Sequence, residues 1–119
     1  MARPEPIHPN LARGRWGEDL AAAWYRARGY TVVARNWRCR TGELDLVVRR
    51  GKLLVVAEVK SRRSDAFGPP ASAVTPAKQQ RIRRLAAEWL TLNDVHGVEV
   101  RFDVVAITGA DLALYEGAF

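Results

Sequence analysis

The first strongly patterned segment of the chain has the spacing of an amphipathic helix. Residues 11–28 repeat apolar side chains every three or four positions. We expect a helix here that is capped by Asn10 and ends at Gly29, because glycine readily takes the left-handed conformation that follows a helix. The buried stripe expected for this helix comprises Trp16, Leu20, Ala23, Trp24 and Ala27.

Short apolar runs further along the chain predict strands. A first strand is expected over 30–35, followed by a polar turn over 36–42. Residues 43–60 read ELDLVVRRGKLLVVAEVK and contain two apolar runs on either side of Arg50-Gly51. Glycine in a two-residue turn is typical of a tight hairpin, so two paired strands are expected here.

The rest of the chain predicts a loop, a second helix and a last strand. Residues 62–75 predict a loop that is long enough to suggest a binding role. Thr75 followed by Pro76 predicts a helix start, since threonine caps helices and proline suits their first position. The buried face expected for this helix comprises Ile82, Leu85, Ala86, Trp89 and Leu90. Residues 98–107 predict the last strand.

The order of these elements, α-β-β-β-α-β, predicts an α/β fold. Three antiparallel strands followed by a helical crossover and a returning strand give a mixed sheet of four to five strands, flanked by helices. A chain of 119 residues suits a single domain over 1–119. Residues 1–9 carry three prolines and predict a flexible tail.

The predicted hairpin gathers charge at one end of one face. With its turn at Arg50-Gly51, Asp45 is expected opposite Val56 and Glu43 opposite Glu58, and Lys60 shares their face. The opposite face is apolar throughout and comprises Leu44, Leu46, Val48, Leu53, Val55, Ala57 and Val59.

This arrangement puts carboxylates close enough to repel one another. Two carboxylates about 5 Å apart repel by roughly 3 kcal/mol at an effective dielectric constant of 20. Either one acid is protonated, or a cation such as Mg²⁺ or Mn²⁺ binds there through Asp45 and Glu58. Lys60 could then position an attacking water and stabilise negative charge on a phosphate. The alternative is a simple ion pair between Glu58 and Lys60 beside a solvated Asp45.

Composition narrows the classes of function. Cys39 is the single cysteine, and the two histidines are distant in sequence, so an internal disulfide and an ordinary zinc site are excluded. The apolar runs are too short to span a bilayer and the N-terminus lacks a signal peptide, so a cytoplasmic protein without membrane contact is expected. The net charge of +6 favours an anionic partner such as nucleic acid only weakly.

The residues around the acidic strand resemble a known family. The Asp45 and Glu58-x-Lys60 spacing looks like the PD-(D/E)xK nuclease motif, with Leu44 where the motif has proline. More closely, the chain resembles the bacterial YraN family, which is similar to archaeal Holliday junction resolvases. The resemblance rests on the segments GRWGEDLAAAWYRARGY, RNWRCRTGELDLVV, LVVAEVKSRR, FGPPASAVTPAKQQRI and RFDVVAI, in order from Gly14 to Ile107.

The resemblance implies a restriction-endonuclease-like core with Asp45, Glu58 and Lys60 as the catalytic set. It also implies that Glu18 lies near the metal, and the carbonyl of Val59 could add a ligand. The leading hypothesis is a Mg²⁺-dependent endonuclease acting on DNA, with branched or junction DNA suggested by the resolvases. The alternatives are a nucleic-acid-binding protein without hydrolysis and a protein-interaction domain. A homodimer is expected only by analogy.

Basic residues near the predicted site could contact nucleic acid or simply face solvent. The candidates are Arg38, Arg40, Arg62, Arg63, Lys78 and Arg81. Trp37 could stack on a base, although packing in the core is favoured. Glu43 could support the metal or hold a basic residue such as Arg40. Asp103 shares a strand face with Arg101, which suggests an ion pair and no further role.

Overall fold

The computed structural model describes residues 9–62, 74–109 and 111–119, without the side chains of 9–14 and 62. Its elements are α1 (Pro9–Ala27), β1 (Thr31–Cys39), β2 (Gly42–Arg50), β3 (Leu53–Arg62), α2 (Pro76–Leu92), β4 (Glu99–Thr108) and β5 (Asp111–Tyr115). The predicted α/β class and element order are confirmed, with β5 added at the end. Most of the predicted tail and of the predicted loop over 62–75 lies outside the described residues. Within the described residues, no helix is long and apolar enough to cross a membrane.

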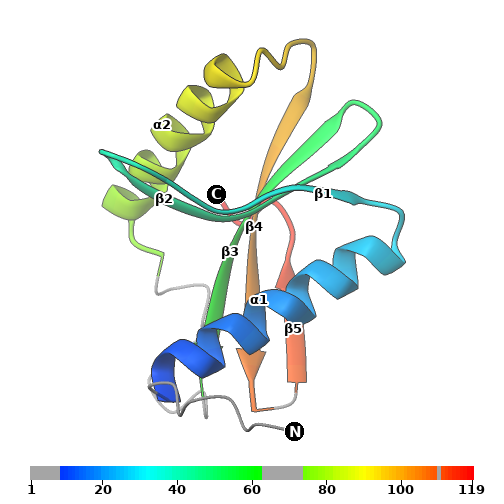
Figure 1. Ribbon diagram of the computed structural model, residues 1–119, viewed down its shortest axis with the longest axis vertical. Coiled ribbons are helices and arrows are strands. Elements are labelled where there is room, and N and C mark those ends of the chain that lie inside the picture. The colour runs from blue at the N-terminus through cyan, green and yellow to red at the C-terminus, as the bar shows by residue number, and fades with distance from the viewer. Residues whose placement is uncertain (1–8, 63–73, 110) are drawn as a thin grey trace, which may run out of the picture.

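The five strands form one mixed sheet in the order β1-β2-β3-β4-β5. All neighbouring strands are antiparallel except β3 and β4, which are parallel because the α2 segment connects them as a crossover. Figure 1 shows α1 crossing in front of the sheet and α2 lying on its other side. The start of α1 and the ends of β3 and β4 lie in the same lower part of that view.

Each face of the sheet has its own apolar core. The core under α1 includes Ala21, Ala22 and Tyr25 of the helix, with Leu46, Val48, Val55, Ala57, Val105 and Ile107 of the strands. The core under α2 includes Ile82, Leu85, Ala86 and Trp89, with Leu44, Val47, Leu54, Val56, Phe102 and Val104. Because the central strands are buried on both faces, they read as nearly continuous apolar runs in the sequence.

The buried stripe predicted for α1 is partly wrong. Trp16, Ala23 and Ala27 are exposed, whereas the face on the sheet is formed by small residues and Tyr25. A Cβ atom at Gly17 would overlap the Ser61 hydroxyl, so the helix backbone lies very close to β3. The chain therefore selects small side chains for the contact, and the larger Trp16 is turned outward. The helix also begins one residue before Asn10, which lies inside it.

The second helix agrees with its prediction. The Thr75 hydroxyl accepts a hydrogen bond from the Lys78 N–H (3.3 Å), and Pro76 opens the first turn. The predicted face is buried, with Leu90 only partly covered. This cap fixes where the first turn of α2 begins, and with it the position of Lys78.

The polar turn predicted over 36–42 is wrong, because β1 continues to Cys39. Asn36 takes a left-handed backbone conformation (φ 50°) within the strand, which asparagine tolerates better than most residues. The pairs on either side, Arg35 with Leu46 and Trp37 with Leu44, keep β1 registered on β2. The polar residues reflect an edge strand with alternating exposure, so polarity alone did not mark a turn.

The register predicted for the β2–β3 hairpin is also wrong, by two residues. Arg50 pairs with Leu53 and Val47 with Val56, so the turn is Gly51-Lys52. Gly51 occupies the first turn position with φ of 60°, as a type II′ turn requires. A shift of two residues keeps side chains on their predicted faces. The exception is Leu44, which packs in the core under α2 although the opposite face was predicted.

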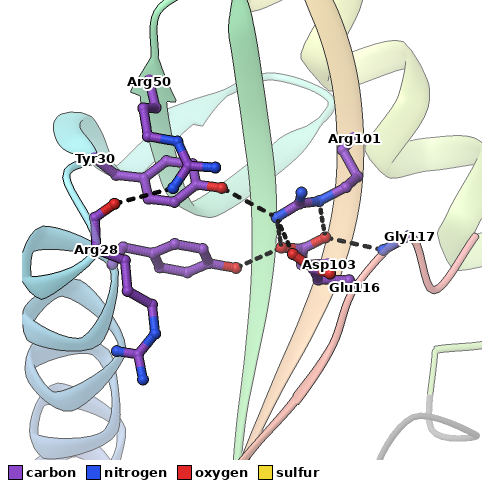
Figure 2. Close-up of polar contacts among 8 residues, drawn as sticks. Arg28, Tyr30, Arg50, Arg101, Asp103, Glu116 and Gly117 are labelled. Carbon is purple, nitrogen blue, oxygen red and sulfur yellow. Dashed lines mark hydrogen bonds and ion pairs between the residues drawn. The ribbon is translucent and has the colours of Figure 1, made fainter.

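A fully buried carboxylate, Asp103 of β4, joins three parts of the fold (Figure 2). Its Oδ2 accepts hydrogen bonds from the Tyr25 hydroxyl (2.7 Å) and Arg101 Nη2 (3.0 Å). Its Oδ1 accepts from Arg101 Nε (2.8 Å) and the Gly117 N–H (3.0 Å). Burial and the bond to Asp103 raise the pKa of Tyr25, so its hydroxyl stays a donor. The expected ion pair with Arg101 is confirmed, and the network also ties α1 and the C-terminal segment to β4.

We predict that Asp103→Ala lowers the free energy of unfolding by at least about 2 kcal/mol, because it leaves the buried Tyr25 hydroxyl without its acceptor and the partly exposed Arg101 guanidinium with Glu116 as its remaining acidic partner. Urea denaturation followed by circular dichroism measures the change. The control is Asp111→Ala at an exposed position of β5, which should alter stability by less than about 0.5 kcal/mol. A loss below about 1 kcal/mol for Asp103→Ala would contradict this account of the network.

Candidate active site

The candidate site begins where the ladder between β2 and β3 ends. Leu46 and Ala57 form the last backbone pair, and one step beyond them Asp45 stands level with Glu58. There the Asp45 Oδ2 accepts a hydrogen bond from the Val59 N–H (2.9 Å). A side-chain carboxylate thus takes the place of a backbone carbonyl as the partner of β3. This bond brings Asp45 next to Glu58, closer than the predicted register would have placed it.

Glu58 is a buried carboxylate with lysines on one of its oxygens. It is 7% exposed, and its Oε1 lies 3.0 Å from the Lys78 ammonium and 3.9 Å from the Lys60 ammonium. Lys60 comes from the same strand, whereas Lys78 reaches across from the first turn of α2. The predicted contact between Glu58 and Lys60 is present, but the shorter ion pair is made by Lys78.

The acidic neighbours change the protonation of Asp45. Burial, followed by the charge of Glu58, raises the pKa of Asp45 to about 7. The Val59 N–H favours the charged form and opposes this rise, while Glu18 and Glu43 add to it. The Asp45 carboxyl group therefore titrates near neutral pH. Burial is the main cause, and the repulsion between carboxylates that the sequence predicted for this corner adds to it.

The pKa values of the two lysines shift in opposite directions. Burial and the neighbouring Lys78 lower the pKa of Lys60. Burial also disfavours the charge of Lys78, but contacts with Lys60 and Glu58 outweigh it, so the pKa of Lys78 is raised. Lys78 is thus the ammonium that neutralises Glu58, and Lys60 is the amine more easily made neutral.

Glu18 approaches the site from α1. Its side chain is 15% exposed, and its Oε2 accepts a hydrogen bond from Asn36 Nδ2 (2.8 Å) and lies 3.9 Å from Arg35 Nη2. The left-handed backbone of Asn36 belongs to the same point of β1 that faces Asp45 across the ladder. Glu18 influences the pKa of Asp45, but its described contacts are with β1.

Glu43 is held by Arg38, where the sequence suggested Arg40. Its Oε2 accepts a hydrogen bond from Arg38 Nε (2.8 Å), and both side chains are exposed. Arg40 is exposed in the turn between β1 and β2. An exposed pair of this kind contributes little stability, so Glu43 remains a neighbour whose charge acts on Asp45 from a distance.

The basic residues proposed to contact nucleic acid are only partly gathered. The exposed Arg81 side chain packs against Gly42 at the β1–β2 turn, on the α2 side of the site. The backbone of Arg62 ends β3 but its side chain is not described, and Arg63 lies outside the described residues. Trp37 is half-buried against the core under α2, which agrees with the packing role favoured from sequence.

The donor atoms suit a hard divalent cation. Asp45 and Glu58 offer carboxylate oxygens, and the Val59 backbone offers a carbonyl oxygen. Mg²⁺ typically takes one or two protein carboxylates and fills its remaining positions with water. No cluster of three His, Cys, Asp or Glu side chains able to hold a metal occurs among the described residues. A cation here would therefore depend on two carboxylates, and it would offset the repulsion between Glu58 and Asp45, which adds to burial in raising the pKa of Asp45.

Two features of the site were missed from the sequence. One is the ion pair between Lys78 and Glu58, and the other is the hydrogen bond from Asn36 to Glu18. The signal for the first was available, because Thr75-Pro76 fixes the helix start and Lys78 is one of only three lysines in the chain. No sequence signal marked Asn36, since its backbone conformation follows from the pairing of β1.

Comparison with known proteins places most of the chain in one family. Residues 17–107 match the family described as "Uncharacterised protein family UPF0102". A UPF0102 protein of Beutenbergia cavernae is 57% identical over 96 residues, which cover 81% of each chain. One of Acidothermus cellulolyticus is 49% identical over 91% of this chain and 93% of its own length. The UPF0102 protein GSU0650 of Geobacter sulfurreducens is 50% identical over 87% of this chain and 81% of its own length.

We predict that Asp45 makes the metal-free protein less stable as the pH rises. Its pKa of about 7 lies above the value of about 3.9 in an unfolded chain. Between these two pH values the folded protein keeps a proton on Asp45 that the unfolded chain has lost. The stability from this group is full below pH ~4 and is lost as the pH passes ~7, by about 1 to 3 kcal/mol.

Asp45→Asn removes this titration while keeping an oxygen for the Val59 N–H. In chelator-treated samples, urea denaturation is measured at pH 5 and pH 8. The unfolding free energy of the variant, relative to that of the wild type, should be larger at pH 8 than at pH 5. If the difference in unfolding free energy between the two proteins is the same at both values, the raised pKa is refuted.

Proposed function

The chain belongs to family UPF0102, which confirms the family expected from its sequence, and from this premise we propose that it is a metal-dependent endonuclease acting on DNA. The observation that carries the proposal is the close grouping of Asp45, Glu58 and Lys60 at the end of the β2–β3 ladder. Two neighbouring carboxylates beside an amine suit metal-assisted phosphodiester hydrolysis. The similarity to resolvases favours branched or junction DNA as the substrate, and the expected homodimer stays a prediction.

A divalent cation, Mg²⁺ or Mn²⁺, would be held by Asp45, Glu58 and the Val59 carbonyl. Such an ion lowers the pKa of a bound water and offsets negative charge on a phosphate. Asp45 is fixed for this role by the Val59 N–H, which orients the carboxylate towards β3. Glu58 is fixed by its strand, because β3 pairs with β4 on both sides of it. Glu18 supports the set from α1 by its charge.

Lys60 is assigned to proton handling and charge stabilisation. Burial and the neighbouring Lys78 lower its pKa, so this amine loses its proton more easily than an ordinary lysine and can act as a proton acceptor for an attacking water, which an arginine could not do. In its charged form it stabilises negative charge on the phosphate. Lys60 pairs with Ala106 across the parallel ladder, so its backbone is held in the interior of the sheet.

The surrounding cations supply sequence-independent contacts to phosphates. Arg38, Arg40 and Arg81 are exposed on the β1–β2 hairpin and α2. Arg62 is the last residue of β3, and Arg63 is its neighbour in the sequence. Binding through such side chains should weaken steeply with salt, because each phosphate contact releases counterions.

We predict that the wild type cleaves DNA in Mg²⁺ or Mn²⁺ and that Asp45→Asn loses at least about a hundredfold in rate, because charge stabilisation of this kind contributes about 10²–10³ in related cases. Linear, flapped and four-way DNA substrates resolved on gels provide the measurement. Asp111→Asn is the matched control, since it removes the same charge from an exposed position of β5. Equal rates for the wild type and Asp45→Asn would refute the catalytic assignment.

The alternative function is nucleic-acid binding without hydrolysis. The neutralisation of Glu58 by lysines favours it, because a paired carboxylate is less available to a cation. This alternative predicts salt-dependent binding that is unchanged in Lys60→Ala and no cleavage with any divalent metal. The same substrates in a gel-shift assay with a salt series distinguish the two functions.

A further inference from the structure

Lys78 makes a contact that differs from those of the other basic residues near the site. Its ammonium lies 3.0 Å from Glu58 Oε1, and its side chain is about one third exposed. Arg38 and Arg35 pair with exposed or partly exposed acids on the surface. Lys78 instead reaches a buried carboxylate that belongs to the candidate catalytic set.

The contact occupies one of the two Glu58 oxygens that are open to the proposed cation. Glu58 is one of the two carboxylates available to a divalent ion, and Lys78 and Lys60 both approach the same atom, Oε1. Two cations beside one carboxylate oxygen repel each other strongly in a partly buried site. A divalent ion on Glu58 and the ammonium of Lys78 at 3.0 Å are therefore mutually unfavourable.

We propose that Lys78 is an exchangeable counter-ion of Glu58: it neutralises this carboxylate in the metal-free protein and leaves it when a divalent cation binds. The released ammonium then contacts a phosphate of the nucleic acid. This inference rests on the proposed function, because it requires a cation at Asp45 and Glu58. In this role Lys78 is more than a general phosphate contact, because it couples the binding of the cation to the binding of the substrate.

The positions of the two lysines explain why Lys78 is the one that moves. Lys60 lies two residues from Glu58 on a strand paired with β4, so its backbone cannot withdraw. Lys78 reaches the carboxylate from a different element, and its exposed part gives it a path to solvent. Arg81 follows three residues later on α2, so the two side chains share one side of the helix. An ammonium released there joins an exposed arginine on the side expected to meet phosphates.

The choice of lysine at this position also fits an exchange. The chain has 16 arginines and three lysines, so arginine is its usual cation. A guanidinium would bind the Glu58 carboxylate through two parallel hydrogen bonds and hold it against competition. A single ammonium makes a contact that a divalent ion can replace. Lys78→Arg is therefore expected to retain the ion pair and to weaken metal binding.

The three lysines make the exchange directly visible by NMR spectroscopy. In protein labelled with ¹³C at the lysine ε-carbons, signals arise from Lys52, Lys60 and Lys78, and single Lys→Met variants assign them. We expect Mg²⁺ to move the Lys78 signal towards that of the exposed Lys52. The same position should be seen without metal in Glu58→Gln, where the partner charge is absent.

The Mg²⁺ midpoint of the Val59 amide signal reports binding in the same samples. We expect Lys78→Met to bind Mg²⁺ about tenfold more tightly than the wild type, because one neighbouring positive charge is gone. Lys78→Arg should bind it more weakly. Lys52→Met is the matched control and should equal the wild type, since it removes the same charge from the β2–β3 turn.

The outcomes separate this inference from the proposed function. If the Val59 amide responds to Mg²⁺ but the Lys78 signal and the Lys78→Met midpoint do not change, the exchange is wrong and the cation site stands. If neither the amide nor any lysine responds in the wild type or in Lys78→Met, both proposals are overturned. Binding that appears only in Lys78→Met supports the exchange in its strongest form.

Discussion

The hydrogen bond from the Val59 N–H to the Asp45 carboxylate is the constraint on which the candidate site depends. It stands where the backbone ladder between β2 and β3 stops, while β3 remains paired with β4 as far as Arg62. The sheet is therefore open on one side of β3 and rigid on the other. The Val59 N–H that this opening frees is satisfied by the Asp45 side chain, and Asp45 stands level with Glu58. Without this bond, no described hydrogen bond would tie the Asp45 carboxylate to β3 beside Glu58.

The buried Asp103 and the partly buried Asp45 have different surroundings, and these give one a structural role and the other a chemical role. Asp103 accepts hydrogen bonds from Tyr25, Arg101 and Gly117, so its charge is matched by donors. Asp45 accepts one described bond, from a neutral N–H, and its burial, followed by the charge of neighbouring acids, raises its pKa to about 7. The first arrangement stabilises the fold. The second leaves a repulsion unresolved in the protein alone, which is typical of a site that a cation or a proton completes.

The sequence predicted the main features of this site because strand alternation determines which side chains share a face. The hairpin register was wrong by two residues, yet Asp45, Glu58 and Lys60 stayed together, because an even shift preserves the faces. The same rule failed at Leu44, next to the point where β2 leaves β3. The family resemblance added Glu18, which no periodicity would have selected.

Other features could not be predicted, because they depend on packing between distant segments. The close approach of α1 to β3 requires Gly17 at the contact and turns Trp16 outward, although helical periodicity favours the tryptophan as the buried residue. Lys78 reaches Glu58 only because the crossover brings the first turn of α2 beside β3. Contacts of this kind arise from the arrangement of elements, so local patterns indicate the elements but not these pairs.

A calorimetric titration of the metal-free protein with Mn²⁺ tests the central claim most directly, with Asp45→Asn and Glu58→Gln measured alongside the wild type. The account predicts one binding event per chain in the wild type and a loss of at least about tenfold in affinity in each variant, because each loses one of the two carboxylate ligands. Asp111→Asn should bind like the wild type. Binding that is absent from all proteins, or equal in all of them, would contradict the claim that Asp45 and Glu58 form a cation site.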